Sequence, residues 1–198
     1  MKDMSTSDKI LKILLREPFI DHTATSLAKT LGISRQGLWK SLNNMASENL
    51  ISLKSVADTK KSAVKIILNF NNIVLEKTLS LLLIKESMKH ERWKVNFKEI
   101  GEEADFVLLF GSILTNPKEA NDIDILVVVK EKQNFKKIEE YLLKIQKTQA
   151  KKIHLIDLTW QEFKSELKIN KTYLDALKKG VVLFGQDNFI KLMKEYGN

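Results

Sequence analysis

Apolar residues recur at helical spacing three times within the first fifty residues, and each set is bounded by residues that start or stop helices. The first helix is expected to begin at Ser7 and to end before Pro18. The second follows Thr23 and stops at Gly32, which suits a left-handed C-terminal turn. The third follows Ser34 and places three residues on its inner stripe: Leu38, Leu42 and Met45.

Two short stretches of strand-forming residues follow Asn49, a residue that tolerates left-handed backbone. They cover about 50–56 and 62–70 and flank a polar tip at 58–61. Three helices, a short glycine-containing turn between the second and third, and a hairpin together predict a winged helix-turn-helix over residues 1–70.

Residues 71–95 contain neither proline nor glycine and carry a helical apolar stripe. We expect one connector helix from about Val74 to Lys94, with Leu75, Leu79, Leu82 and Met88 on the stripe. Further apolar residues lie off this stripe, and either packing between domains or homodimerisation accounts for them: Leu81, Leu83 and Ile84.

Residues 96–198 alternate between strand and helix patterns. Strands are expected at 105–110, 122–130 and 151–159, with a short strand at 181–185. Helices are expected after 130, at 160–168, 171–179 and 187–196, with Trp160, Phe163 and Leu167 as core. The predicted fold class is therefore α/β (α+β), in which a helix joins the winged helix-turn-helix to a mixed sheet with flanking helices.

Composition and apolar runs bear on the cellular location of the protein and on membrane binding. The chain has no cysteine, which excludes a disulfide framework and thiolate zinc sites and fits a cytoplasmic location. The segment MKDMSTSDKI lacks the apolar core of a signal peptide, and the apolar runs are too short for a membrane span. We therefore expect no membrane partner.

Positive charge is concentrated in the N-terminal part, which predicts a polyanion partner there. Residues 1–70 hold 11 Lys and Arg against 6 Asp and Glu, whereas the remaining 128 residues hold 22 against 19. We expect DNA to be the partner, with base edges or phosphates contacted by Arg35, Gln36, Lys40, Asn43, Lys60 and Lys61. Alternatively these are ordinary solvated residues and the domain makes protein contacts.

Two acidic residues, Asp122 and Asp124, open the strand expected at 122–130. Because side chains alternate along a strand, both carboxylates project from one face, and their repulsion favours a hard divalent cation, Mg²⁺ (or Mn²⁺). Ahead of them, Gly111 lets the backbone approach a ligand, and Ser112 can donate its hydroxyl and amide to phosphate oxygens, especially if a short helix begins at Ile113. The pattern predicts a nucleotide site with two metal ligands; in the alternative, the acids only cap a turn.

Both halves of the chain resemble known families. SLAKTLGISRQGLWKSLNNMASENLI is similar to the winged helix-turn-helix families of prokaryotic regulators. The order of a hydrophobic strand, Gly111-Ser112, a loop and Asp122-Ile123-Asp124 opening a second hydrophobic strand resembles minimal nucleotidyltransferases with the DNA polymerase β palm. The fusion suggests a prokaryotic, archaeal-type protein.

The second resemblance covers about residues 90–198 and implies transfer of NMP from an NTP to an acceptor hydroxyl of a protein, a nucleic acid or a small molecule. The chain departs from the family pattern, because GSILTNPKEAN lacks an early basic residue and a second glycine. Asn116-Pro117 predicts a turn instead. Neutralisation of phosphate then falls to Lys118 or to residues elsewhere.

The family resemblance also implies a third acid on the third core strand. In KKIHLIDLT the matching position holds His154, and an acid, Asp157, follows three residues later. Asp157 is the candidate third catalytic residue, and His154 is its alternative as a metal ligand or proton acceptor. The two side chains point to opposite faces of a regular strand, so both can serve only if the strand bulges or ends.

Three functions fit these features. The first is a magnesium-dependent nucleotidyltransferase with a DNA-binding domain. The second is a DNA-binding transcription regulator whose C-terminal domain only binds nucleotide or is catalytically silent. The third is a modification enzyme whose N-terminal domain recruits an RNA or protein acceptor. A homodimer on paired DNA half-sites is compatible with the first two.

Overall fold

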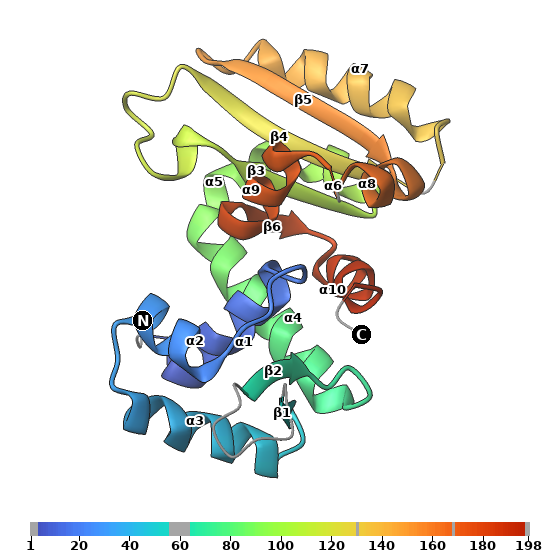
Figure 1. Ribbon diagram of the computed structural model, residues 1–198. Helices are drawn as coiled ribbons and strands as arrows, with labels where there is room; N and C mark the ends of the chain where they lie inside the picture. Colours follow the sequence, from blue (N-terminus) through green and yellow to red (C-terminus); the bar gives the residue numbers. More distant parts are fainter. Residues whose placement is uncertain (1–3, 56–63, 130, 168, 197–198) are drawn as a thin grey trace. The chain divides into compact units, whose positions relative to one another are not determined.

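The computed structural model describes residues 4–55, 64–129, 131–167 and 169–196 (Figure 1). The chain forms two compact units, Met1–Leu82 with Ile190–Asn198, and Leu83–Phe189. Residues from Ile190 onward belong to the first unit, where the Lys194 ammonium donates to the Phe70 carbonyl at 2.9 Å and to the Glu76 carboxylate at 2.8 Å. The boundaries expected at 70 and 95 stay a prediction.

The N-terminal unit has the predicted winged helix-turn-helix order. Its elements are α1 (Thr6–Arg16), α2 (Ala24–Leu31), α3 (Arg35–Ser47), β1 (Ile51–Ser55) and β2 (Val64–Leu68). The two strands pair antiparallel, from Ile51 opposite Leu68 to Ser55 opposite Val64. The His22 carbonyl accepts a hydrogen bond from the Ile66 amide at 3.0 Å, which ties the start of α2 to the hairpin.

Helix ends follow the predicted capping residues with one exception. Thr23 and Ser34 cap α2 and α3, and Gly32 and Asn49 adopt φ angles of 64° and 56° in the left-handed region. The cap of α1 is Ser5, not Ser7 as expected. Ser5 and the side chain of Asp8 form a reciprocal capping box, so the helix begins two residues earlier in the sequence than the apolar pattern indicates.

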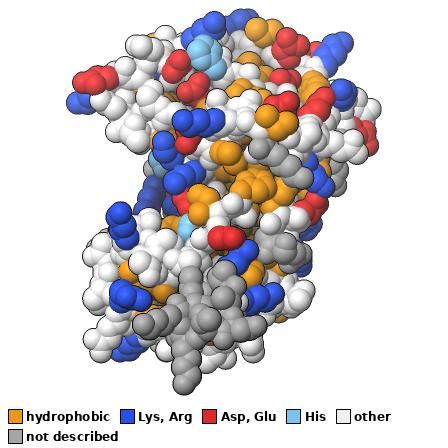
Figure 2. Space-filling view, in the orientation of Figure 1, with side chains coloured by type: hydrophobic (Ala, Val, Ile, Leu, Met, Phe, Trp, Pro, Cys, Tyr) orange, Lys and Arg blue, Asp and Glu red, His pale blue; other side chains and the backbone are white. Residues whose placement is uncertain are grey.

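Helix α3 separates its buried and exposed positions as predicted. Leu38, Leu42 and Met45 are buried, whereas the expected DNA-contacting residues of this helix are all exposed: Arg35, Gln36, Lys40 and Asn43. Lys60 and Lys61 lie outside the described residues. On the face drawn in Figure 2, basic side chains of this unit occupy several separate places rather than one continuous patch.

The expectation of one connector helix is wrong. Helix α4 (Ile73–Ser87) is followed by a 3-10 turn, η1 (Met88–His90), and by α5 (Glu91–Asn96). His90 leaves helical geometry with φ −117° and ψ 39°, and the hydroxyl of buried Ser87 donates to the Ile84 carbonyl at 2.9 Å. After this change of direction, Trp93 and Phe97 are buried and their rings stack 6.0 Å apart. This packing accounts for the helix break, which the sequence does not mark with a proline or glycine.

The second unit is built on a four-stranded mixed sheet, which confirms the predicted fold class. Its strand order is β5 (Lys152–Thr159), β4 (Asp122–Val129), β3 (Phe106–Phe110) and β6 (Val181–Phe184). The β4–β5 pair is parallel, and β3 pairs antiparallel with both β4 and β6. The remaining elements are α6 (Lys98–Glu103), η2 (Ser112–Leu114), α7 (Asn134–Gln146), α8 (Trp160–Glu166) and α9 (Lys171–Lys179). The last helix, α10 (Gln186–Lys194), begins in the second unit and ends in the first.

Alternating burial along β4 orients the acidic pair. Ile123, Ile125, Val127 and Val129 are buried in a core that α5, α6 and α7 share. The other face of β4 carries Asp122 and Asp124 at its start and buried Leu126 and Val128 further on. On that face, buried Phe106 meets the rings of Phe163 and Phe189 edge-on at 5.6 and 5.5 Å. Phe163 and Leu167 are buried as predicted, whereas Trp160 is only half-buried. None of the helices in the described ranges has the length and apolarity to cross a membrane.

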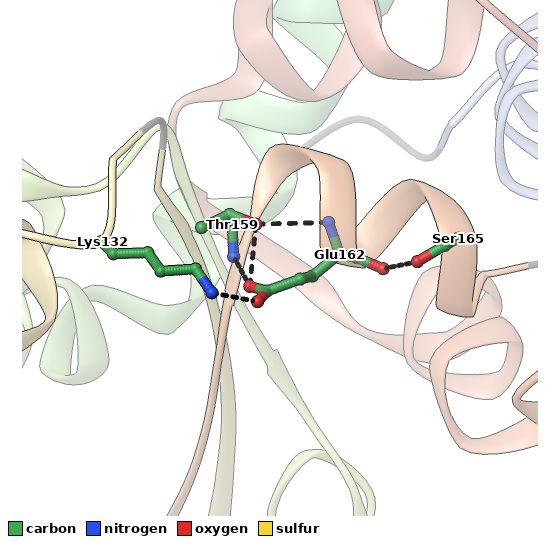
Figure 3. Close-up of polar contacts among 4 residues, drawn as sticks. All are labelled: Lys132, Thr159, Glu162 and Ser165. Carbon is green, nitrogen blue, oxygen red and sulfur yellow. Dashed lines mark hydrogen bonds and ion pairs between the residues drawn. The ribbon is translucent and has the colours of Figure 1, made fainter.

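A polar cluster fixes the junction of β5 and α8 (Figure 3). The Glu162 carboxylate accepts hydrogen bonds from the Thr159 amide at 2.8 Å and hydroxyl at 2.7 Å, and it pairs with the Lys132 ammonium at 2.9 Å. Lys132 first, and then the Thr159 donors, lower the pKa of Glu162 from 4.5 to about 2.

Replacement of Glu162 by Gln should destabilise the chain in a pH-dependent way. A carboxylate with a lowered pKa stabilises the fold above its unfolded pKa, and this contribution is lost as the pH falls through the folded value. The stability difference between the parent and Glu162→Gln should therefore be full above pH 4.5 and should shrink toward pH 2 in denaturant titrations. Glu166→Gln, on the neighbouring turn, controls for lost charge, and a pH-independent difference would contradict the ionic contribution.

Candidate metal and nucleotide site

The parallel register of β4 and β5 assembles the candidate site. Asp124 lies opposite His154, and Asp122 lies opposite Lys152. Residues in register on paired strands share a face of the sheet, so both acids and His154 project from the same side. Asp124 also pairs with Phe110 at the end of β3, which brings the next residue, Gly111, to the site.

The three side chains converge. The Nδ1 atom of His154 lies 3.3 Å from an Asp122 carboxylate oxygen and 3.5 Å from an Asp124 carboxylate oxygen. Within the described ranges, these residues form a group whose ligand atoms all lie within 4.8 Å of one another. The side chain of His154 is 47% exposed and those of the acids 32% and 25%, so the group is open to ligands from solvent.

The electrostatics of the group favour an added cation. Partial burial raises the pKa of the Asp124 carboxyl, and the charge of Asp122 raises it further, whereas His154 opposes both effects. Ionising both acids therefore carries a free-energy cost in the bare site. A positive charge placed between them offsets this cost.

Glycine is required at position 111 by two separate features. Its backbone has φ 81° and ψ −166°, a region that is almost exclusive to glycine. A Cβ atom built at this position would overlap the carboxylate of Asp124. Gly111 therefore lets the chain pass directly over one of the two acids, as the sequence indicated for a close backbone approach.

The loop from Ser112 to Asn121 is held by local hydrogen bonds. The Ser112 carbonyl accepts from the Asn116 amide at 2.8 Å, and the Asn116 carbonyl accepts from the Ala120 amide at 3.0 Å, which forms the predicted turn. The Lys151 ammonium donates to the carbonyls of Ala120 and Lys118, the latter at 3.4 Å. Ser112 itself is exposed at the start of η2, one residue earlier than expected, and η2 has only three residues. Any role in phosphate binding therefore rests on its hydroxyl and amide rather than on a helix dipole.

The structure separates the two candidates for the third residue. His154 joins the acids, whereas Asp157 pairs in register with Val127, whose side chain is in the core on the opposite face. Strand β5 runs unbroken from Lys152 to Thr159, so no bulge returns Asp157 to the acidic pair. The placement favours the alternative, His154, over Asp157.

One basic residue near the site, Lys152, was not predicted from the sequence. Lys118 is exposed in the loop, as its expected phosphate role requires, but Lys152 also shares a face with Asp122 through the β4–β5 register. The signal was present in the sequence, because Lys152 and His154 are two residues apart on one strand.

The donor set fits a divalent cation. Two carboxylates supply hard oxygen ligands, and an unprotonated imidazole supplies a nitrogen. Asp122, Asp124 and His154 would hold the ion, and Gly111 leaves no Cβ that would displace the Asp124 carboxylate.

Comparison with known proteins supports the class of the second unit. A family model described as "Polymerase beta, Nucleotidyltransferase" matches residues 95–189, which include Gly111, Ser112, both acids and His154. This region is thus similar to the nucleotidyltransferase domains of that family. No curated protein matches the chain.

Solved structures give only weak likenesses. The adhesin competence repressor AdcR from Streptococcus pyogenes is 19% identical and has a TM-score of 0.35, with 49% of this chain and 67% of that chain covered. The C30AH42A mutant of Lactococcus lactis ZitR is 21% identical with a TM-score of 0.33, covering 59% and 68%. Likenesses of this size carry no argument about the function of the chain, and the archaeal type expected from the sequence stays a prediction.

Replacement of Gly111 by Ala should disturb the site and the fold together. The strained backbone and the overlap with Asp124 should lower the free energy of unfolding by about 1–3 kcal/mol, measured by denaturant titration. Gly32→Ala is the matched control, because Gly32 also has a positive φ but has no atom within 4 Å of the added Cβ. Equal costs at the two positions would contradict the claim that the Asp124 carboxylate crowds position 111.

Proposed function

We propose that this chain is a nucleotidyltransferase that transfers NMP from an NTP to an acceptor hydroxyl and carries a DNA-binding domain. The observation that supports the proposal most strongly is the convergence of Asp122, Asp124 and His154 beside the tight turn at Gly111. The family match over residues 95–189 supports the same class of chemistry.

The proposed reaction is an in-line substitution at the α-phosphorus of the NTP. The acceptor oxygen forms a bond to this phosphorus while the bond from phosphorus to the oxygen bridging the β-phosphate breaks. Pyrophosphate leaves with the bonding electron pair, and the hydroxyl proton passes to solvent. A bound divalent ion supplies neutralisation of phosphate charge when present.

The residues of the chain have separate roles in this proposal. Asp122 and Asp124 hold the ion, and the hydroxyl and amide of Ser112 donate to phosphate oxygens. Gly111 admits the triphosphate close to the backbone. Lys152, on the same face as Asp122, offsets phosphate charge together with Lys118. Protein, RNA and small molecules all offer suitable hydroxyls, and a cell extract contains all three classes of acceptor.

Transfer of radiolabel from an NTP to an acceptor tests the proposed enzymatic activity. Purified protein mixed with α-³²P-labelled NTPs, Mg²⁺ or Mn²⁺ and cell extract should label an acceptor. Asp122→Asn combined with Asp124→Asn should reduce the label at least about a hundredfold, the loss typical when one electrostatic contact at a transition state is removed.

Asp175→Asn, an exposed acid on α9, is the control for lost charge and should keep transfer intact. Asp157→Asn compared with His154→Asn shows which third residue contributes. Absence of transfer with every NTP and both metals would contradict the enzyme proposal.

A second function, a DNA-binding transcription regulator, is supported by a different observation. Helix α3 buries one stripe and exposes Arg35, Gln36, Lys40 and Asn43, which is the arrangement of a recognition helix. In this alternative the second unit only binds nucleotide or is catalytically silent. Exposed apolar residues of α4 at seven-residue spacing, Val74 and Leu81, fit the expected homodimer.

Gel retardation of a fragment from upstream of the protein's own gene tests DNA binding. Arg35→Ala should reduce the preference for this fragment over unrelated DNA by about 1–3 kcal/mol, because base contacts carry specificity. Lys40→Ala should weaken binding to all DNA alike and lower the slope of log affinity against log salt by about 1. Unchanged binding in both variants would contradict the assignment of α3 as the DNA-contacting helix.

A further inference from the structure

We propose that His154 makes the acidic site selective for a first-row transition-metal ion, such as Mn²⁺ or Co²⁺, over Mg²⁺. The inference rests on the proposed function only in taking Asp122 and Asp124 as metal ligands. It concerns the one residue at the site where this chain departs from an all-carboxylate donor set.

The observed distances suit shared coordination. Two ligands at right angles, each about 2.1 Å from an ion, lie about 3 Å apart. The Nδ1 atom of His154 lies 3.3 Å from Asp122 and 3.5 Å from Asp124, close to this value. An ion can therefore enter with small side-chain movements and no rearrangement of the strands.

The position of His154 is set by the fold. It lies opposite Asp124 in the parallel β4–β5 register, and the start of β5 is fastened to α7 through Gln146. The Gln146 side chain accepts from the Ile153 amide at 2.8 Å and donates to the Lys151 carbonyl at 3.0 Å. Hydrogen bonds therefore fix the backbone on both sides of His154 and keep its imidazole next to both acids.

Ligand chemistry then determines the preference. Mg²⁺ requires near-octahedral oxygen coordination and parts reluctantly from its waters, whereas imidazole nitrogen is a good ligand for transition-metal ions. A neutral imidazole in place of a third carboxylate also removes one negative charge, which weakens the attraction of every divalent ion. Only a transition-metal ion regains affinity from the nitrogen ligand, so the donor set lowers the affinity for Mg²⁺ relative to a transition-metal ion.

Direct binding tests the inference without nucleotide or turnover. The full chain is titrated with Co²⁺, followed by its visible absorption and by the imidazole signals in ¹H–¹⁵N spectra, and Mg²⁺ is then added as competitor. The wild type should bind Co²⁺ with a shift of the His154 signals, and displacement should require a large excess of Mg²⁺.

His154→Asp should lower the ratio of Co²⁺ to Mg²⁺ affinity by at least about tenfold, the effect of losing even an outer-shell partner of a metal ligand. His154→Asn, a second variant without the ring, should lower the Co²⁺ affinity as well. Asp175→Asn should leave both affinities unchanged, and melting curves confirm that each variant is folded.

Two results would overturn the inference: an affinity ratio that is equal in the wild type and His154→Asp, or Co²⁺ binding that leaves the His154 signals in place. Label transfer that persists with Mg²⁺ under either result would leave the proposed function standing. Selective Co²⁺ binding without transfer would instead support the inference and contradict the enzyme.

Discussion

The parallel register between β4 and β5 is the constraint on which the candidate site depends. It sets Asp124 opposite His154, although β5 is an edge strand with a neighbour on one side only. A slip of one residue would turn His154 to the other face of the sheet. Burial of Ile123 and Ile153 on the opposite face resists such a slip, because a slip would expose apolar side chains. The alternation of apolar residues that builds the core therefore also sets the positions of Asp122, Asp124 and His154.

The charged form of one acid at the site, Asp124, is disfavoured by its surroundings. Partial burial of Asp124 disfavours its charged form, and repulsion from Asp122, two residues away on the same face, adds to this cost. Gly111 brings the backbone close to the same carboxylate. His154, on the neighbouring strand, contacts both acids and opposes the rise in the pKa of Asp124. An arrangement that concentrates negative charge at the start of β4 and leaves it partly exposed suits a cation with a phosphate ligand.

The features that the sequence predicted are those that depend on neighbouring residues alone. The buried stripe of α3 and the strands of both units follow from periodicity, because periodicity reports burial directly. The break near His90 could not be predicted, since it depends on how Trp93 and Phe97 pack against the sheet. The choice between His154 and Asp157 was open for a similar reason. The register between strands that lie far apart in the sequence is a tertiary property, and only the folded sheet supplies it.

The central claim is that Asp122, Asp124 and His154 together hold the divalent ion of a nucleotide site. A crystal structure with Mn²⁺ and a non-hydrolysable NTP analogue tests it most directly, because anomalous scattering locates the ion. The account predicts an anomalous peak within bonding distance of both carboxylates and of His154 Nδ1, with the triphosphate against Gly111 and Ser112. Nucleotide bound elsewhere, or a peak coordinated without these three residues, would contradict it.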